Sequence, residues 1–156
     1  MATTQQILDQ EFELLKDDLI KEYDRLGMRS SGKFADGLNV ETTSNVAKLT
    51  GDKYAEQLEF GRKSGKRPPI EAIKQWIKDK GIVSNIKNDA NNSSLAFLIA
   101  RKIGEQGWKR QKHGGVELIS NIVTDIRMQS IIDKVGNELT ITLISRLEKE
   151  LLKLAV

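Results

Sequence analysis

The sequence predicts an α+β fold, with long helices packed around one β-hairpin. At both ends of the 156-residue chain, apolar residues recur every three to four positions, which is the period of one face of a helix. Between these ends, residues 33–51 show the pattern of two short strands joined by a polar turn. A chain of this length can bury one core of ordinary size, so we expect a single domain over residues 1–156.

The first apolar stripe predicts a helix that ends near Gly27. Its members are separated by 4, 3, 4, 4 and 3 residues and are Leu8, Phe12, Leu15, Leu19, Tyr23 and Leu26. Thr3 or Thr4 can cap the first turn, and Gly27 can end the last one. Residues 1–26 hold seven acids and three bases, so this segment carries a charge of −4.

A β-hairpin is expected to follow. We predict a strand over residues 33–42, because Phe34, Leu38 and Val40 would share one face of an extended chain. Gly37 would weaken this strand or mark a bulge. The turn "TSN" then leads to a second short strand, "VAKLTG".

Three helices are expected in the middle of the chain. The first is "DKYAEQLEFG", with Asp52 as its cap and Gly61 as its end. The second begins at the proline pair, where proline loses no hydrogen bond, and the third begins at Ser93, after the polar connector "SNIKNDANNSS". Inward-facing residues are expected at Ile70, Ile73 and Ile77 of the second helix, with Trp76 beside them, and at Leu95, Leu98, Ile99 and Ile103 of the third.

A second long stripe predicts a helix from about residue 125 to residue 155. Its members are separated by 4, 3, 4, 4, 4, 4 and 3 residues and are Met128, Ile132, Val135, Leu139, Leu143, Leu147, Leu151 and Leu154. Gly136 inside this helix costs roughly 1 kcal/mol relative to alanine. Residues 116–123 are compatible with the same helix, a separate helix or a strand, and all three remain open.

The net charge of +3 is unevenly distributed. Residues 60–113 hold thirteen bases and four acids, a charge of +9, whereas residues 1–26 carry −4. Such a basic middle can bind nucleic acid or the acidic end of a second copy. The chain has no cysteine, which excludes disulfides and cysteine-based zinc sites and fits a reducing cytosol. We also expect no secretory signal and no membrane span.

No residue pattern points to catalysis. Gly61 and Gly65 are separated by three residues rather than the four of a phosphate-binding loop, and Lys66 is followed by arginine rather than by a hydroxyl. His113 is the only histidine, so a transition-metal site is not expected. Two acid pairs on expected helices fit a solvated surface better than an acid–base pair: Asp17 with Asp18, and Glu56 with Glu59. We therefore expect no enzyme, no cofactor and no metal.

Two basic loops, residues 61–67 and 108–113, are the best candidates for a functional site. Their cations are Arg62, Lys63, Lys66, Arg67, Lys109, Arg110, Lys112 and His113. With Trp108 adjacent, they could stack on bases and neutralise phosphates. Two other interpretations stay open: the loops are simply solvated, or they contact acids on a neighbouring subunit, such as those over residues 9–24.

The order of segments resembles the neck or tail-completion proteins of tailed bacteriophages, the minor tail components at the head–tail joint of lambda-like and related phages. The resemblance is carried by "YAEQLEFGRKSGKRPPIEAIKQWIKDKGI", then by "SLAFLIARKIGEQGW", and by the final amphipathic helix, and it covers most of the chain. The matching motif residues are Tyr54, Leu58, Glu59 and Gly61, then Pro68, Pro69, Ile73, Trp76, Ile77, Lys80 and Gly81, and finally Leu95, Ala96, Phe97, Ile99, Ala100, Arg101, Ile103 and Gly107.

The resemblance implies a non-enzymatic virion protein, assembled in the host cytoplasm and located at the head–tail joint. Six or twelve copies would form a ring around the DNA exit channel, touching the portal-side connector, tail proteins and, transiently, the genome, with no membrane. The eight cations of the two loops would then contact a neighbouring subunit or face the channel. The alternative is a small nucleic-acid-binding protein that uses loops 61–67 and 108–113. For a ring, we expect that the apolar stripes are not all covered within one copy.

Overall fold

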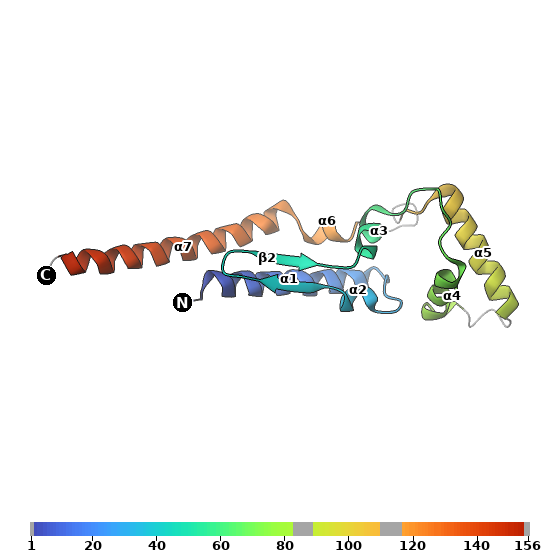
Figure 1. Cartoon of the computed structure of the whole chain (residues 1–156), viewed down its shortest axis with the longest axis horizontal. Helices are drawn as coiled ribbons and strands as arrows, with labels where there is room; N and C mark the ends of the chain where they lie inside the picture. The colour runs from blue at the N-terminus through green and yellow to red at the C-terminus, as the bar shows by residue number, and fades with distance from the viewer. Residues whose placement is uncertain (1, 83–88, 110–116, 155–156) are drawn as a thin grey trace.

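The computed structural model describes residues 2–82, 89–109 and 117–154. It is 68% helical with one two-stranded antiparallel hairpin, which confirms the predicted α+β fold. Figure 1 shows an elongated molecule, in which α1, the hairpin, α6 and α7 form one body while α4 and α5 lie together at the other end. The basic segment between α3 and α4 connects these two parts.

Helix α1 (Thr4–Arg25) has the bounds and the inward face that its apolar stripe predicts. Thr3 caps it: its hydroxyl oxygen accepts from the Gln6 amide at 3.2 Å, and the Gln6 side-chain oxygen accepts from the Thr3 amide at 2.8 Å. Gly27 follows the helix with a φ of +62°, a left-handed conformation that suits a helix end. Leu15, Leu19 and Tyr23 are buried on the predicted face.

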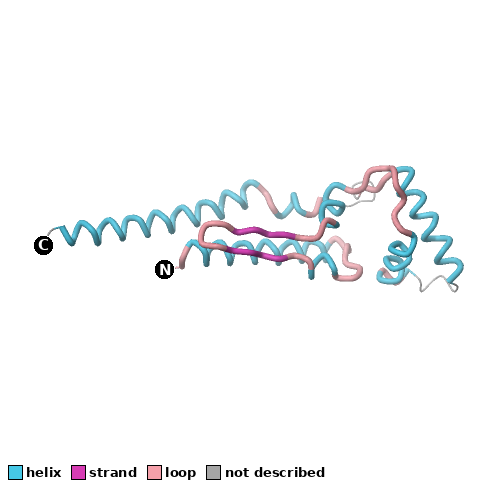
Figure 2. The backbone as a smooth tube through the Cα atoms, in the orientation of Figure 1, coloured by secondary structure: helices cyan, strands magenta, loops and turns pink. Residues whose placement is uncertain are grey.

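The hairpin lies along α1, as the two magenta strands in Figure 2 show. Strand β1 (Asn39–Thr42) pairs antiparallel with β2 (Ala47–Thr50), and Val40 lies opposite Leu49. This confirms the predicted hairpin and its polar turn.

The first half of the predicted strand over residues 33–42 is wrong, because residues 33–36 form the short helix α2 (Lys33–Asp36). Phe34 and Leu38 are four residues apart, a spacing that one helical turn also places on one side. Both side chains are buried, and the Phe34 ring lies 4.5 Å from that of Tyr23. Gly37 is not a bulge; its amide donates to the Lys33 carbonyl at 2.9 Å and closes the turn of α2.

The main core joins α1, α2, the hairpin, α3 (Tyr54–Phe60) and α6 (Ile119–Ile122). Its buried members are Leu19, Tyr23, Met28, Phe34, Leu38, Leu58 and Leu118. Three alternatives were left open for residues 116–123. The structure shows the separate helix, which covers residues 119–122. The predicted end of α3 at Gly61 is confirmed, but no side-chain hydrogen bond caps its first turn, so Asp52 does not act as predicted.

Helices α4 (Ile70–Asp79) and α5 (Asp89–Gln106) pack against each other. Ile77 of α4 is fully buried and Ile73 is half-buried, as predicted, whereas Ile70 and Trp76 are each 38% exposed. The predicted inward stripe of α4 is therefore confirmed at Ile73 and Ile77 but not at Ile70.

The predicted start and inward face of α5 need correction. The helix begins at Asp89, so Ser93 lies inside it rather than at its cap. Asn92, Ala96 and Ala100 are buried. Of the predicted inward residues, Leu95, Ile99 and Ile103 are half-buried, while Leu98 is 49% exposed. Small side chains let two helices approach closely, so the α5 face toward α4 is centred on alanines rather than on the larger apolar residues.

Helix α7 (Asp125–Leu154) has the predicted length and runs antiparallel to α1. Arg127 donates to Asp18 at 2.6 Å, and Lys134 to Glu11 at 2.5 Å. The residue buried against the body is Ile131, which is not in the predicted stripe. Most of that stripe is exposed, which confirms, for the part of the chain that the structure describes, that one copy does not cover all its apolar faces.

Gly136→Ala is expected to stabilise the protein. A Cβ atom at this position would meet nothing within 4 Å, so the change adds helix propensity without a clash. The gain should be about 1 kcal/mol in the free energy of unfolding, measured by thermal or urea denaturation. Asn137→Ala, at a neighbouring exposed position of α7, is the matched control and should give a smaller gain.

Candidate functional site

The two predicted basic loops lie together at their bases. The Arg62 amide donates to the Trp108 carbonyl at 2.6 Å, and the Trp108 amide donates to the Arg62 carbonyl at 2.7 Å. A third bond joins the Gly65 amide to the Gly104 carbonyl at 2.7 Å. Segments far apart in the sequence thus form one basic surface between α3 and the α4–α5 pair.

Three glycines allow this close approach. A Cβ atom on Gly61 would overlap the Trp108 carbonyl oxygen, and one on Gly107 would overlap the Arg62 carbonyl oxygen. At Gly104 the added atom would lie 2.6 Å from the Arg67 side chain. Gly61 and Gly107 also have φ angles of +76° and +69°, which favour glycine. The sequence patterns predicted Gly61 only as a helix end, because nothing local reveals a contact with residue 108.

Two of the predicted cations shape the first loop from within. The Arg62 guanidinium donates to the Lys66 carbonyl at 2.9 Å, closing residues 62–66 into a turn. The Arg67 guanidinium lies 5.7 Å from the centre of the Phe97 ring, a cation–π distance that ties the loop to α5. These arginines therefore act at least partly as structural groups.

The remaining described cations of the site face solvent. Lys63, Lys66 and Lys109 are exposed, so their ammonium groups can reach a passing anion or an acidic surface. Arg110, Lys112 and His113 of the prediction lie outside the described residues. The described part of the site is therefore a hydrogen-bonded base with three exposed lysines.

Glu59 is buried and joins α3 to α6. One carboxylate oxygen accepts from the Ile119 amide at 2.6 Å. The other accepts from the Ser120 amide at 3.1 Å and from the Ser120 hydroxyl. The prediction that Glu59 belongs to a solvated surface is wrong, since its donors come from about sixty residues later in the chain. Glu56 is exposed, so these two acids form no common site.

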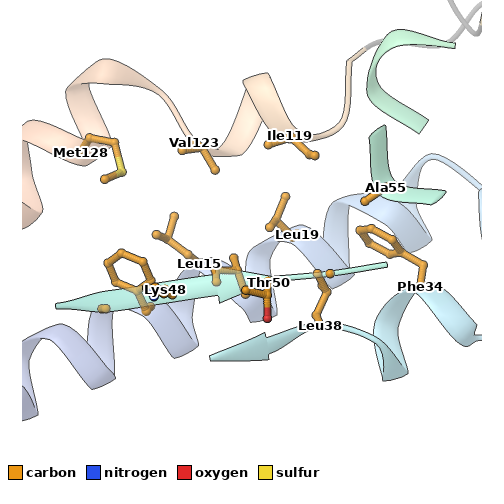
Figure 3. A pocket seen from close by; sticks show the side chains of 14 residues that line it. Leu15, Leu19, Phe34, Leu38, Lys48, Thr50, Ala55, Ile119, Val123 and Met128 are labelled. Atoms are coloured by element: carbon orange, nitrogen blue, oxygen red, sulfur yellow. The ribbon is translucent and has the colours of Figure 1, made fainter. Parts of the chain in front are cut away.

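An apolar groove opens between α1 with the hairpin on one side and α6 with the start of α7 on the other (Figure 3). Its volume is about 500 Å³. Leu15, Leu19, Leu49, Val123 and Met128 are among the side chains that line it, and Lys48 is the one charged residue of the lining. This lining offers no acid–base pair, so the groove suits an apolar partner better than a reaction.

Within residues 2–82, 89–109 and 117–154, no group of histidine, aspartate or glutamate side chains has the arrangement of a metal site. The same residues contain no helix with the length and apolar character of a membrane span. No protein-family model matches the chain, and neither does any curated protein or solved structure. The chain's own residues are therefore the basis for a functional proposal.

Proposed function

We propose that this protein is a structural component of the head–tail joint of a tailed bacteriophage, where its copies form a ring around the DNA exit channel. The observation that carries the proposal is the uncovered end of α7. Leu143, Leu147 and Leu151 are 54–64% exposed on a single copy. Soluble monomers rarely expose a contiguous apolar surface of this kind, so other subunits are expected to cover it.

The segments that resemble phage neck and tail-completion proteins correspond to defined parts of the molecule. They form α3, the basic loop 61–67, α4, most of α5, and α7. Two of the three motif glycines of the resemblance, Gly61 and Gly107, are among the residues that let the two basic loops meet. The resemblance therefore extends to residues that shape the candidate site.

The exposed lysines suit a channel or a subunit contact. Lys63, Lys66 and Lys109 present a few solvated charges, whose attraction to phosphates is strongly screened by salt. Weak contacts of this kind would let DNA slide, and they could also meet the acidic α1 segment of a neighbour. In this role the protein catalyses nothing, needs no cofactor or membrane, and passes from the host cytoplasm into the virion.

A DNA-binding measurement tests this role against a dedicated nucleic-acid binder. We expect the wild-type chain to bind a short duplex only in the non-specific range, with a dissociation constant no tighter than about 1 μM at physiological salt. Replacing Lys63, Lys66 and Lys109 with glutamine should reduce the slope of log affinity against log salt by about 2.7, which is about 0.9 for each phosphate that is no longer neutralised. Fluorescence anisotropy over a salt series measures both quantities.

The matched control replaces the exposed lysines Lys78, Lys102 and Lys149 with glutamine, which removes the same charge from helices outside the loops. It should change the salt slope by much less than the loop variant. If a monomer of the wild-type chain binds the duplex in the nanomolar range, and only the loop variant loses this binding, the result would favour the nucleic-acid-binding protein instead. The observation that favours that alternative is the presence of Trp108 beside the exposed lysines.

A further inference from the structure

The end of α7 extends beyond the rest of its own body. The ion pairs Asp18–Arg127 and Glu11–Lys134 fix how α7 is aligned with the antiparallel helix α1. In both pairs the residue numbers sum to 145, so residues of the two helices whose numbers sum to 145 lie level with each other. The first residue of α1, Thr4, therefore lies level with Ile141. From there α7 continues for thirteen residues to Leu154, a length of about 20 Å. Figure 1 shows no other described element beside this end.

The apolar face of this end points away from α1. At 100° per residue, six exposed side chains of residues 139–154 fall within an arc of about 140°. They are Leu139, Leu143, Ile144, Leu147, Leu151 and Leu154. The centre of the arc lies about 150° around the helix from Ile131, the residue buried against the body. Bending α7 toward α1 would therefore leave this face, which we name the distal face, in solvent.

The groove between α1, the hairpin and the α6–α7 connection is a second apolar surface that a single copy leaves open. Protein interiors contain few voids larger than a water molecule, whereas this groove measures about 500 Å³ and is lined mainly by apolar side chains. Water gains few hydrogen bonds there, because the labelled side chains in Figure 3 are mostly aliphatic or aromatic.

We infer that the distal face of α7 from one copy fills this groove in the next copy. One such contact per copy covers both uncovered surfaces at once, whereas pairing two α7 helices would cover neither groove. Because the helix and the groove are different surfaces, the contact is head-to-tail. Such a contact gives a ring when the rotation between successive copies closes, as the proposed function requires. This inference rests on the proposed homo-oligomer and names the surfaces that build it.

The area of the distal face agrees with a specific interface. The six side chains are 49–83% exposed, which leaves about 350 Å² of apolar surface if each carries roughly 100 Å². Apolar atoms form about 60% of typical interfaces, so this apolar area corresponds to about 600 Å² of buried surface per partner. That area is at the lower end of the range for stable complexes. Each copy makes two such contacts, one through its helix and one through its groove.

The absence of cysteine permits a cross-linking test without background. We would place Leu147→Cys on the distal face and Val123→Cys in the groove of the same chain, and treat the protein with a short bis-maleimide. The expected product is a ladder of covalent multimers that stops at the copy number of the ring. In a mixture of the two single variants, the expected product is a dimer that contains one of each.

Cross-linking of Leu147→Cys to itself as the main product would overturn the inference in favour of paired α7 helices. Lys149→Cys, on the opposite side of α7, is the control for Leu147→Cys. A yield of cross-linked product with Val123→Cys that is no higher for Leu147→Cys than for Lys149→Cys would also overturn the inference. In that case the groove and the distal face have other occupants, such as a tail protein or a small apolar ligand.

A second variant separates this contact from the ring itself. Leu147→Gln with Leu151→Gln should weaken self-association at least tenfold in sedimentation velocity, while circular dichroism stays unchanged because both side chains are exposed in one copy. Lys149→Gln with Lys153→Gln is the matched control and should not weaken it comparably. A ring unchanged in mass and stability in the leucine variant would overturn this contact but leave the ring. A wild-type chain that never self-associates would overturn both.

Discussion

Gly61→Ala is expected to separate the two basic loops. The φ and ψ angles of Gly61, +76° and −163°, lie in a region that is essentially restricted to glycine. An added Cβ atom would also overlap the Trp108 carbonyl oxygen and lie 3.0 Å from the Lys109 Cα atom. Backbone atoms cannot rotate away as a flexible side chain can, so the paired segments must move apart.

The cost should be about 3 kcal/mol or more, combining backbone strain with the loss of the hydrogen bonds between Arg62 and Trp108. For a chain of this size, that corresponds to a fall in melting temperature of roughly 6–12 °C if the loops unfold with the body. Hydrogen exchange gives a more local measurement, because the Arg62 and Trp108 amides should lose protection.

Gly81→Ala is the matched control for this change. Gly81 also has a positive φ angle, +67°, but an added Cβ atom would meet nothing within 4 Å. Its cost should therefore be limited to left-handed strain, about 1 kcal/mol. Equal effects of the two variants would contradict the close approach of the loops.

Glu59→Ala is expected to detach α6 from α3. The carboxylate accepts from two amides and one hydroxyl in a buried position, and hydrogen bonds to charged groups contribute roughly 1.5–3 kcal/mol each. Removing the carboxylate leaves the Ile119 and Ser120 amides without this acceptor. We expect a loss of about 3 kcal/mol in the free energy of unfolding, measured by urea denaturation.

Two further variants show whether the carboxylate is responsible. Glu59→Gln keeps one acceptor oxygen and should lose about half as much stability. Glu56→Ala changes an exposed acid on the same helix and should alter stability by less than about 0.5 kcal/mol. A loss in Glu56→Ala as large as that in Glu59→Ala would point to the helix propensity of α3 rather than to the contact with α6.

The two long helices could be predicted from the sequence because each repeats one spacing over many residues. Thr3, Gly27 and the span of α7 follow from such local patterns. The first strand was predicted too long because Phe34 and Leu38 fit a helical turn as well as an extended chain. The start of α5 was missed because its first turns are polar, from Asp89 onward.

The geometry of the candidate site could be predicted only in part. The basic composition identifies the loops, but the pairing of Arg62 with Trp108 joins residues that are far apart in the chain. The same holds for Glu59 and the amides of α6. Such contacts leave no local period, and their one sequence signal is the presence of glycines at the ends of the basic segments.

Native mass spectrometry of the wild-type chain, at several protein concentrations and with and without a short DNA duplex, tests whether identical copies form a closed ring. We expect a discrete species of six or twelve copies that forms without DNA and becomes more populated as the protein concentration rises. A monomer at every concentration, or a monomer or dimer that carries DNA as the dominant species, would contradict it.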